Sequence, residues 1–169
     1  MKPVLEKSRI FLTPFELEDI ALLHQTFTHP FIRKYLFDDE IISKEMAKEI
    51  MAINEEKFDK ENWGLWKITT KNDNAYSGFA GLWQFFNEDQ PQLIFGLLPV
   101  KKGLGYATEA SIAILDYAFT HLNYRYLTAS FDTINVASEK VCQRIRMVRE
   151  GERKLNSRMT TFYRIERPQ

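Results

Sequence analysis

Residues 92–110 read Gln92-Leu-Ile-Phe-Gly-Leu-Leu-Pro-Val-Lys-Lys-Gly-Leu-Gly-Tyr-Ala-Thr-Glu-Ala110. An apolar, strand-like run comes first, then a lysine-containing turn with Gly103 and Gly105, and then a helical pattern. Backbone N–H groups at such a turn, together with the positive end of the helix dipole, form an anion-binding site. The segment therefore predicts a ligand that carries phosphate groups.

Two well-known phosphate-binding motifs do not match this turn. A P-loop ends in Gly-Lys-Ser/Thr, whereas Gly105 is followed by Tyr-Ala-Thr. A dinucleotide-binding fingerprint needs a third glycine three residues later, where this chain has Thr108. The turn by itself also fits a simple loop in which glycine permits a positive φ or close packing.

Bulk properties narrow the class of protein. The 169 residues fit one domain, expected over 1–169, and the 23 basic and 23 acidic residues cancel. A neutral chain has no bulk attraction for nucleic acid or an anionic membrane, so neither is expected as a partner. Cys142 is the only cysteine and the three histidines are scattered, so we expect no metal site. The chain begins without a signal-peptide core and has no apolar run near the ~20 residues of a membrane span, which predicts a cytoplasmic protein.

Hydrophobic spacing along the chain predicts alternating strands and helices. Strands are expected over 9–15, 63–70, 75–86, from Gln92, and over 126–131, 149–152 and 160–165. Helices are expected over 17–27, after a Ser43 cap, over 107–121 and over 135–147, with Pro30 ending the first helical region. Residues 13–16 also fit a helix-capping box, in competition with the first strand. This order predicts an α+β fold with helices around a mixed sheet.

A second candidate binding feature follows the strand at 126–131. Asn135 is placed to cap the next helix, and Ser138 lies one turn further on the same face. In isolation such a pair is more often a cap followed by a solvated serine. Its place one strand after the glycine turn favours a role in ligand binding.

Together these segments resemble the GNAT superfamily of N-acetyltransferases, and most closely its RimJ/RimL-like branch. The resemblance rests on Arg9-Ile-Phe-Leu-Thr-Pro-Phe-Glu-Leu-Glu-Asp-Ile20, on His29-Pro-Phe-Ile-Arg-Lys-Tyr-Leu36, on residues 95–110, and on Asn135 through Gly151. It implies an α+β fold of three α/β/α layers, with a central, mostly antiparallel mixed sheet and splayed strands at the acetyl-CoA site.

The resemblance also implies an activity and its site residues. Acetyl-CoA is the implied cosubstrate, and a primary amine on a protein N-terminus or small molecule is the implied acceptor. Direct attack needs no metal, and the protein is expected as a monomer or homodimer. The implied acetyl-CoA-binding residues are Phe95, Leu97 and Leu98 along the pantetheine, Lys102, Gly103, Leu104, Gly105, Tyr106 and Ala107 at the pyrophosphate, and Asn135 and Ser138 on the pantetheine. A backbone N–H of Leu97 or Leu98 is the expected oxyanion donor.

The chain departs from the family pattern at two catalytic positions. Gln92 stands where related enzymes often have Glu, and an amide is not a general base. The base must then lie elsewhere, or the amine arrives already neutral. Glu88, Asp89 and Asp132 are near in the expected topology, but each fits a turn carboxylate better than a base. Cys142 stands at the position of a general-acid Tyr, where it either protonates the departing thiolate or, as we favour, only packs. These departures leave a non-catalytic acyl-CoA-binding module or sensor as the alternative.

The sequence has no motif for the acceptor site. Its expected walls come from ring-bearing side chains, most of which also suit a core: His24, Phe27, Phe31, Tyr35, Phe37 and Trp83.

Overall fold

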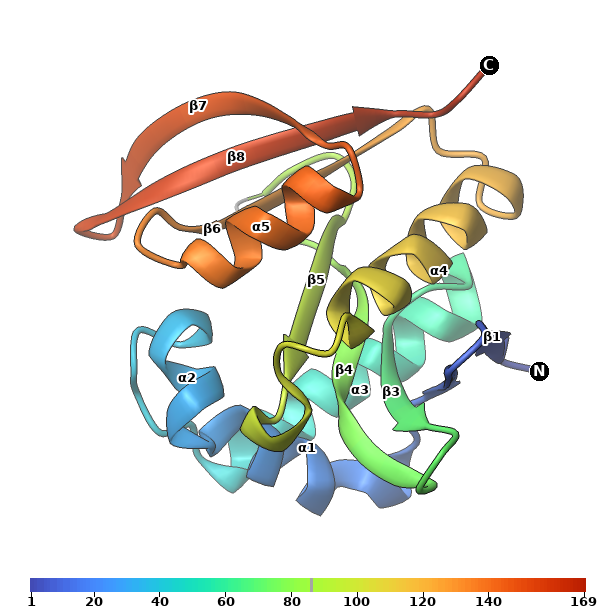
Figure 1. Cartoon of the computed structure of the whole chain (residues 1–169). Helices are drawn as coiled ribbons and strands as arrows, with labels where there is room; N and C mark the ends of the chain where they lie inside the picture. The colour runs from blue at the N-terminus through green and yellow to red at the C-terminus, as the bar shows by residue number, and fades with distance from the viewer. Residues whose placement is uncertain (86) are drawn as a thin grey trace.

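A computed structural model of the chain describes residues 1–85 and 87–169 (Figure 1). The first half contains β1 (Leu5–Glu6), β2 (Ile10–Pro14), the 3₁₀ turn η1 (Leu17–Asp19), α1 (Ile20–Thr28), α2 (Pro30–Leu36), α3 (Lys44–Glu61), β3 (Leu65–Thr70) and β4 (Ala75–Trp83). The second half contains β5 (Gln92–Leu97), η2 (Pro99–Lys101), α4 (Tyr106–Thr120), β6 (Tyr126–Asp132), α5 (Val136–Arg144), β7 (Val148–Leu155) and β8 (Arg158–Glu166).

The strands form two antiparallel sheets that meet at β5 and β6. One sheet has the order β1-β2-β3-β4-β5 and the other β6-β8-β7. At the start of the two facing strands, Gln90 Nε2 donates to the Tyr126 carbonyl at 2.7 Å and Ser130 Oγ donates to Gln92 Oε1 at 2.7 Å. Both contacts advance in the same direction along β5 and β6, as in parallel neighbours. Beyond these two contacts, the described residues of β5 and β6 form no backbone ladder with each other, so the two strands diverge.

Helices cover both faces of the sheets (Figure 1). Leu23 of α1 and Met51 of α3 pack with Phe79 of β4 on one face. On the other face, Ile114 of α4 packs with Leu93 of β5 in a second cluster. The predicted three-layer α+β fold with splayed strands is confirmed. Within the described residues, no helix combines the length and apolar character that a membrane crossing needs.

Several predicted element boundaries differ from the structure. The capping box at the first helical turn is formed by Glu16 and Asp19 and not by residues 13–16, because β2 continues to Pro14. Pro30 starts a separate helix, α2, in which proline suits the first position. The helix after Asn135 stops at Arg144, shortly before the left-handed Arg146 with φ 67°. The expected strand over 75–86 ends at Trp83, and Phe86 lies outside the described residues.

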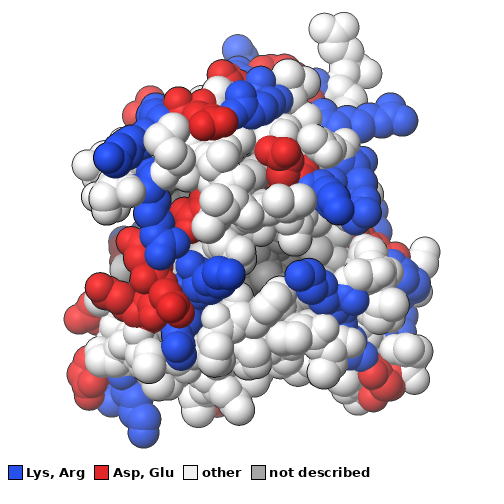
Figure 2. All heavy atoms as spheres, turned by 60° about the vertical axis from the view of Figure 1, so that its left-hand side comes forward, with Lys and Arg blue, Asp and Glu red and all other residues white. Residues whose placement is uncertain are grey.

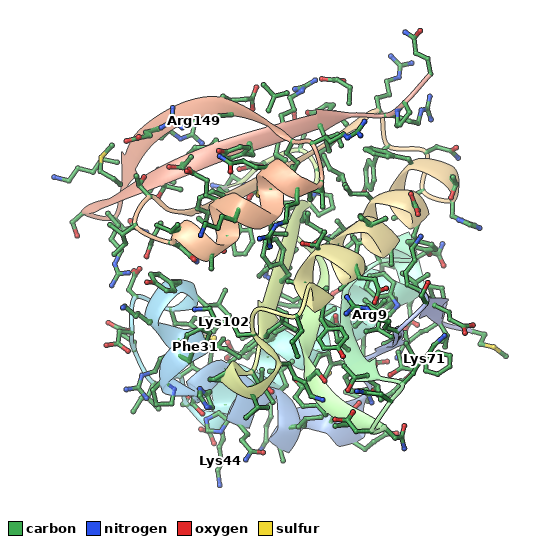
Figure 3. All side chains as sticks on the ribbon, viewed as in Figure 1. Arg9, Phe31, Lys44, Lys71, Lys102 and Arg149 are labelled. Carbon is green, nitrogen blue, oxygen red and sulfur yellow. The ribbon has the colours of Figure 1, made fainter. Side chains whose placement is uncertain are left out.

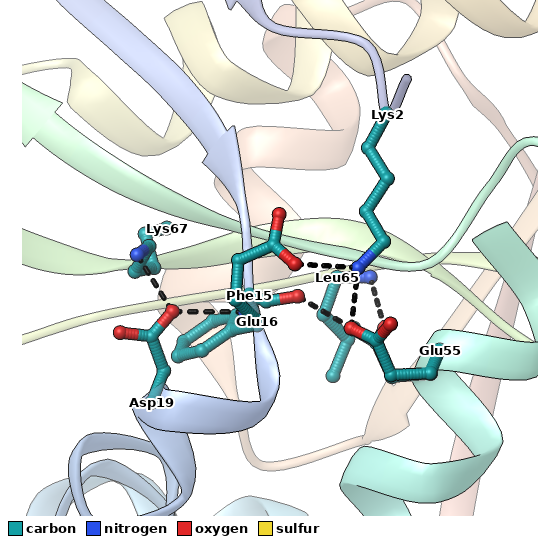
Figure 4. A network of polar contacts seen from close by, with 8 residues as sticks. Lys2, Phe15, Glu16, Asp19, Glu55, Leu65 and Lys67 are labelled. Atoms are coloured by element: carbon teal, nitrogen blue, oxygen red, sulfur yellow. Dashed lines mark hydrogen bonds and ion pairs between the residues drawn. The ribbon is translucent and has the colours of Figure 1, made fainter.

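A polar network fastens α3 and the N-terminal segment to the sheet (Figure 4). The fully buried Asn54 accepts the Leu65 N–H at 2.8 Å and donates to the Phe15 carbonyl at 3.3 Å. Lys2 pairs with both Glu16 and Glu55 beside it. Because a buried amide must be hydrogen-bonded, Asn54 fixes α3 against β3 and against the residue that follows β2, and so holds the helical layer in place.

Candidate active site

A cavity of about 810 Å³ lies between the diverging strands β5 and β6. Its wall comes from α2, β5, the glycine turn, β6, the start of α5 and the β7–β8 hairpin. Figure 2 shows this hollow with Lys and Arg side chains on both sides of it. The basic residues that line it are Lys34, Lys102, Lys140, Arg144 and Arg158. A cavity of this size and charge suits a small ligand with anionic groups.

The glycine turn has the conformation that its sequence predicts. Gly103 has φ 78° and Gly105 has φ 85°, left-handed values that glycine adopts without strain. Gly105 is the N-cap of α4 and provides no side-chain cap. The first N–H groups of a helix have no partner within the helix. At the start of α4 they therefore provide donors for an anion beside the cavity.

Arg9, the residue before β2, holds this turn (Figure 3). Its guanidinium donates to the Leu104 carbonyl at 2.8 Å and lies 4.5 Å from the centre of the Tyr106 ring. The same group is 3.5 Å from the Glu109 carboxylate. Arg9 therefore fixes the carbonyl side of the turn and leaves the N–H groups for a ligand.

The two lysines before the glycines do not both face the ligand. Lys101 is buried, pairs with Asp73 and donates to Thr70 Oγ1 at 3.1 Å, so it anchors the turn to the β3–β4 connection. The Lys102 N–H donates to the Pro99 carbonyl at 3.1 Å, which corrects the expectation that this N–H binds pyrophosphate. The Lys102 side chain lines the cavity, with Nζ 4.7 Å from the Phe31 ring centre (Figure 3).

The Lys101–Asp73 pair predicts a loss of stability in acid. Hydrogen bonds from Lys101 and Thr70 lower the pKa of Asp73 from 3.8 to about 2. A carboxyl whose folded-state pKa is lowered stabilises the fold fully above its ordinary pKa, and this stabilisation is lost as the pH falls through the lowered value. We expect Asp73→Asn to lower the urea midpoint at neutral pH, and we expect this difference to shrink as the pH falls from 3.8 to about 2. Asp59→Asn, on the exposed face of α3, is the control and should leave the urea midpoint unchanged at both neutral and acid pH. If Asp73→Asn lowered the urea midpoint by the same amount at every pH, the stabilising role of the Lys101–Asp73 pair would be contradicted.

The free edge of β5 has a defined hydrogen-bonding direction. The Leu98 N–H donates to the Ser77 carbonyl of the neighbouring chain segment at 2.9 Å. In an antiparallel ladder, successive N–H groups point to opposite sides, so those of Phe95 and Leu97 point away from β4 toward the cavity. The oxyanion donor expected at Leu97 or Leu98 is therefore corrected in part: the Leu98 N–H is already used, and only Leu97 has a suitable direction.

The Asn135 cap is confirmed. Asn135 Oδ1 accepts the Ser138 N–H at 3.2 Å and so begins α5. Asn135 and Ser138 both line the cavity, as do the two glycines of the turn. Of the other predicted ligand residues, Phe95, Leu97, Gly103, Gly105 and Ala107 line it too, whereas Leu98, Leu104 and Tyr106 do not.

Cys142 does not reach the cavity. Its thiol is fully buried in the cluster beneath α4, and burial raises its pKa to about 12. A thiol in this position has no path to a departing thiolate in the cavity. The general-acid expectation is therefore corrected in favour of packing.

Comparison with known proteins identifies the family. Residues 9–148 match the family model of the acetyltransferase (GNAT) domain. The chain belongs to the GNAT family of acetyltransferases. Among curated relatives, an uncharacterised N-acetyltransferase of Bacillus subtilis, YnaD, is 26% identical over 143 residues, which covers 85% of this chain and 81% of the relative.

Solved acetyltransferase structures share the fold over nearly the whole chain. An acetyltransferase from Agrobacterium tumefaciens superposes with a TM-score of 0.83 at 20% identity, covering 97% of this chain and 94% of the other. RimL, a ribosomal L7/L12 alpha-N-protein acetyltransferase solved with coenzyme A, superposes with a TM-score of 0.81 at 15% identity, covering 97% and 98%. The expected likeness to RimL-type folds is confirmed.

The far end of the cavity of this GNAT chain lies under α2. Phe31 and Tyr35, two of the rings expected to wall the acceptor site, line this end of the cavity. The remaining rings lie elsewhere: Phe27 is buried and touches Phe37, His24 lies 2.9 Å from the Ile42 carbonyl, and Trp83 borders a smaller hollow. Asp132 lines this end too, but its carboxylate accepts from Arg158 at 2.6 Å.

The environment of Gln92 is not evident from the local sequence. This side chain is only 1% exposed and bridges β5 to β6 through Ser130. The alternation of β6 was the available signal, because it places Ser130 and Asp132 on one face of that strand.

Proposed function

We propose that this GNAT protein transfers the acetyl group of acetyl-CoA to a primary amine by direct attack. One observation carries the proposal: a single cavity joins the glycine turn, the free edge of β5 and the space under α2. The acetyl donor and the amine then approach the gap between β5 and β6 from opposite ends.

The described residues suit acetyl-CoA as a substrate. The N–H groups of the cavity-lining residues Gly103, Gly105, Ala107 and Thr108 suit its pyrophosphate, and the edge groups of Phe95 and Leu97 suit its pantetheine. Lys140 and Arg144 lie four residues apart on α5, both exposed and lining the cavity. Neither takes part in an ion pair within residues 1–85 and 87–169, which leaves both available to phosphate groups.

The chain's part in the reaction is to orient the reactants and stabilise charge. The thioester supplies the activated acetyl group. The amine must be neutral, because an ammonium ion has no lone pair for attack. As the amine nitrogen bonds to the acetyl carbon, the Leu97 N–H donates to the developing oxyanion. The C–S bond then breaks and CoA leaves as the thiol, so that the proton lost by the nitrogen balances the one taken up by the sulfur, with no covalent intermediate on the protein. The acceptor class is a protein N-terminus, as for RimL, or a small primary amine.

A second candidate function is an acyl-CoA sensor without turnover. The amide at Gln92 and the buried Cys142 favour it, because both occupy positions where catalytic groups were expected. The sensor shares the phosphate site and differs only in chemistry.

Thiol release separates the two functions. Wild-type protein is mixed with acetyl-CoA and, in turn, peptides that begin with Ala or Ser, spermidine, and an aminoglycoside. We expect acetyl-CoA at a hundredfold excess over Kd to stabilise the fold by about 2.7 kcal/mol, and CoA thiol to appear with at least one amine. Stabilisation with no thiol for any amine would favour the sensor. A melting temperature that saturating acetyl-CoA leaves unchanged would contradict both.

A further inference from the structure

The orientation of the Gln92 amide is fixed by its two partners. Gln92 Nε2 donates to Glu88 Oε1 at 2.6 Å. An ionised carboxylate only accepts hydrogen bonds, so the NH₂ end of the amide must face Glu88. The carbonyl end, Oε1, then faces Ser130, whose Oγ lies 2.7 Å away.

This orientation determines the role of the Ser130 hydroxyl. An amide oxygen only accepts, so Ser130 must donate its single proton to Gln92. The Ser130 oxygen keeps lone pairs, and Ser130 lines the cavity whereas Gln92 and Glu88 do not. The Ser130 oxygen is therefore available as a hydrogen-bond acceptor in the cavity, at the point where β5 and β6 diverge.

The acceptor oxygen lies on the side of the sheet that faces α1–α3. Leu93 and Phe95 of β5 pack toward α4, whereas Ile94 packs with the cluster beneath α1–α3. Because side chains alternate along a strand, Gln92 points to the same side as Ile94. The Gln92–Ser130 contact therefore lies across the sheet from α4, on the side where Phe31 and Tyr35 line the cavity.

We propose that Ser130 orients the acceptor amine by accepting one of its N–H groups, and that Gln92 and Glu88 are positioning residues that hold Ser130 in this state. The inference rests on the proposed transfer to an amine. It gives Gln92 a role for which an amide suffices. In this role the Gln92 side chain does not act as a base and instead fixes the direction of the neighbouring Ser130 hydroxyl. A hydrogen bond through one N–H leaves the nitrogen lone pair free for attack.

Ser130→Ala tests the first part of the proposal. With the best amine of the peptide and polyamine panel, we expect kcat/KM for the amine to fall about three- to tenfold, the value of one net hydrogen bond. Kd for acetyl-CoA should not change, and Ser130→Thr should retain most of the activity. Thr128→Val is the matched control, since its hydroxyl is on the same face of β6 and has no hydrogen-bond partner among the described residues.

A double-mutant cycle tests the second part. Gln92→Leu frees the Ser130 proton to turn into the cavity, so we expect a loss like that of Ser130→Ala. The double variant should be no worse than either single variant, because both remove the same interaction. A Gln92 that served only to join the strands would instead give additive losses.

The outcomes separate this inference from the proposed function. An active wild-type protein whose Ser130→Ala variant keeps full kcat/KM for the amine would overturn the inference and leave the transferase function standing. Additive losses in the cycle would overturn the positioning role of Gln92. A wild-type protein that binds acetyl-CoA and acetylates no amine would overturn the proposed function and this inference with it.

Discussion

Replacing Gly105 with glutamate is expected to raise the Kd for acetyl-CoA more than about a hundredfold while the chain still folds. Gly105 has φ 85°, and an added Cβ would lie 3.1 Å from an Arg9 guanidinium nitrogen. A non-glycine residue at such a φ costs roughly 1–3 kcal/mol. The carboxylate would also place negative charge at the N-terminus of α4, where the phosphate groups are expected to bind. Strain and repulsion act together on the same turn.

Gly151→Glu is the matched control for this substitution. Gly151 also has a positive φ, 146°, but it lies in β7 and an added Cβ would meet nothing within 4 Å. Isothermal titration calorimetry with acetyl-CoA should give the wild-type Kd for Gly151→Glu and no measurable binding for Gly105→Glu. Wild-type affinity in a folded Gly105→Glu protein would show that the phosphates bind elsewhere.

Replacing the Leu97 amide with an ester is expected to lower kcat about 10²- to 10³-fold, the usual cost of one oxyanion donor. Incorporating the α-hydroxy analogue of leucine at position 97 removes the N–H and keeps the side chain. This N–H points away from β4, so its loss spares the ladder between β4 and β5. Kd for acetyl-CoA is expected to change much less than kcat, because the oxyanion forms only during the reaction.

The same ester at Leu98 is the control. The Leu98 N–H donates to the Ser77 carbonyl, so its removal should lower the melting temperature and leave kcat near the wild-type value. Leu97→Ala, which keeps the N–H, should also retain kcat within a small factor. Turnover that is lost at position 98 and kept at position 97 would refute the assignment.

The features that the sequence predicted correctly are local ones. Gly103 and Gly105 have positive φ, a requirement that glycine itself signals. The Asn135 cap is formed by a bond across three residues, and Ser43 caps α3 in the same way. The apolar run from Gln92 predicts the strand that begins there. Each of these signals is contained within a few residues of the chain.

The features that the sequence did not predict depend on distant pairing. Arg9 meets the glycine turn 95 residues away, and Ser130 meets Gln92 across 38 residues. The use of the Leu98 N–H follows from the register between β4 and β5. The position of Cys142 on the helix after Asn135 can be predicted from spacing. The direction of its side chain cannot, because it depends on how α5 packs beneath α4. Such contacts have no local pattern from which to infer them.

Transfer of a labelled acetyl group tests the central claim most directly. Wild-type protein is mixed with stoichiometric isotopically labelled acetyl-CoA and the amine that released most thiol, and the products are measured by mass spectrometry. The proposed function predicts label on the amine nitrogen, one CoA released for each acetylated amine, and no label on the protein. CoA released with no label on the amine nitrogen would contradict it, and so would label retained on the protein.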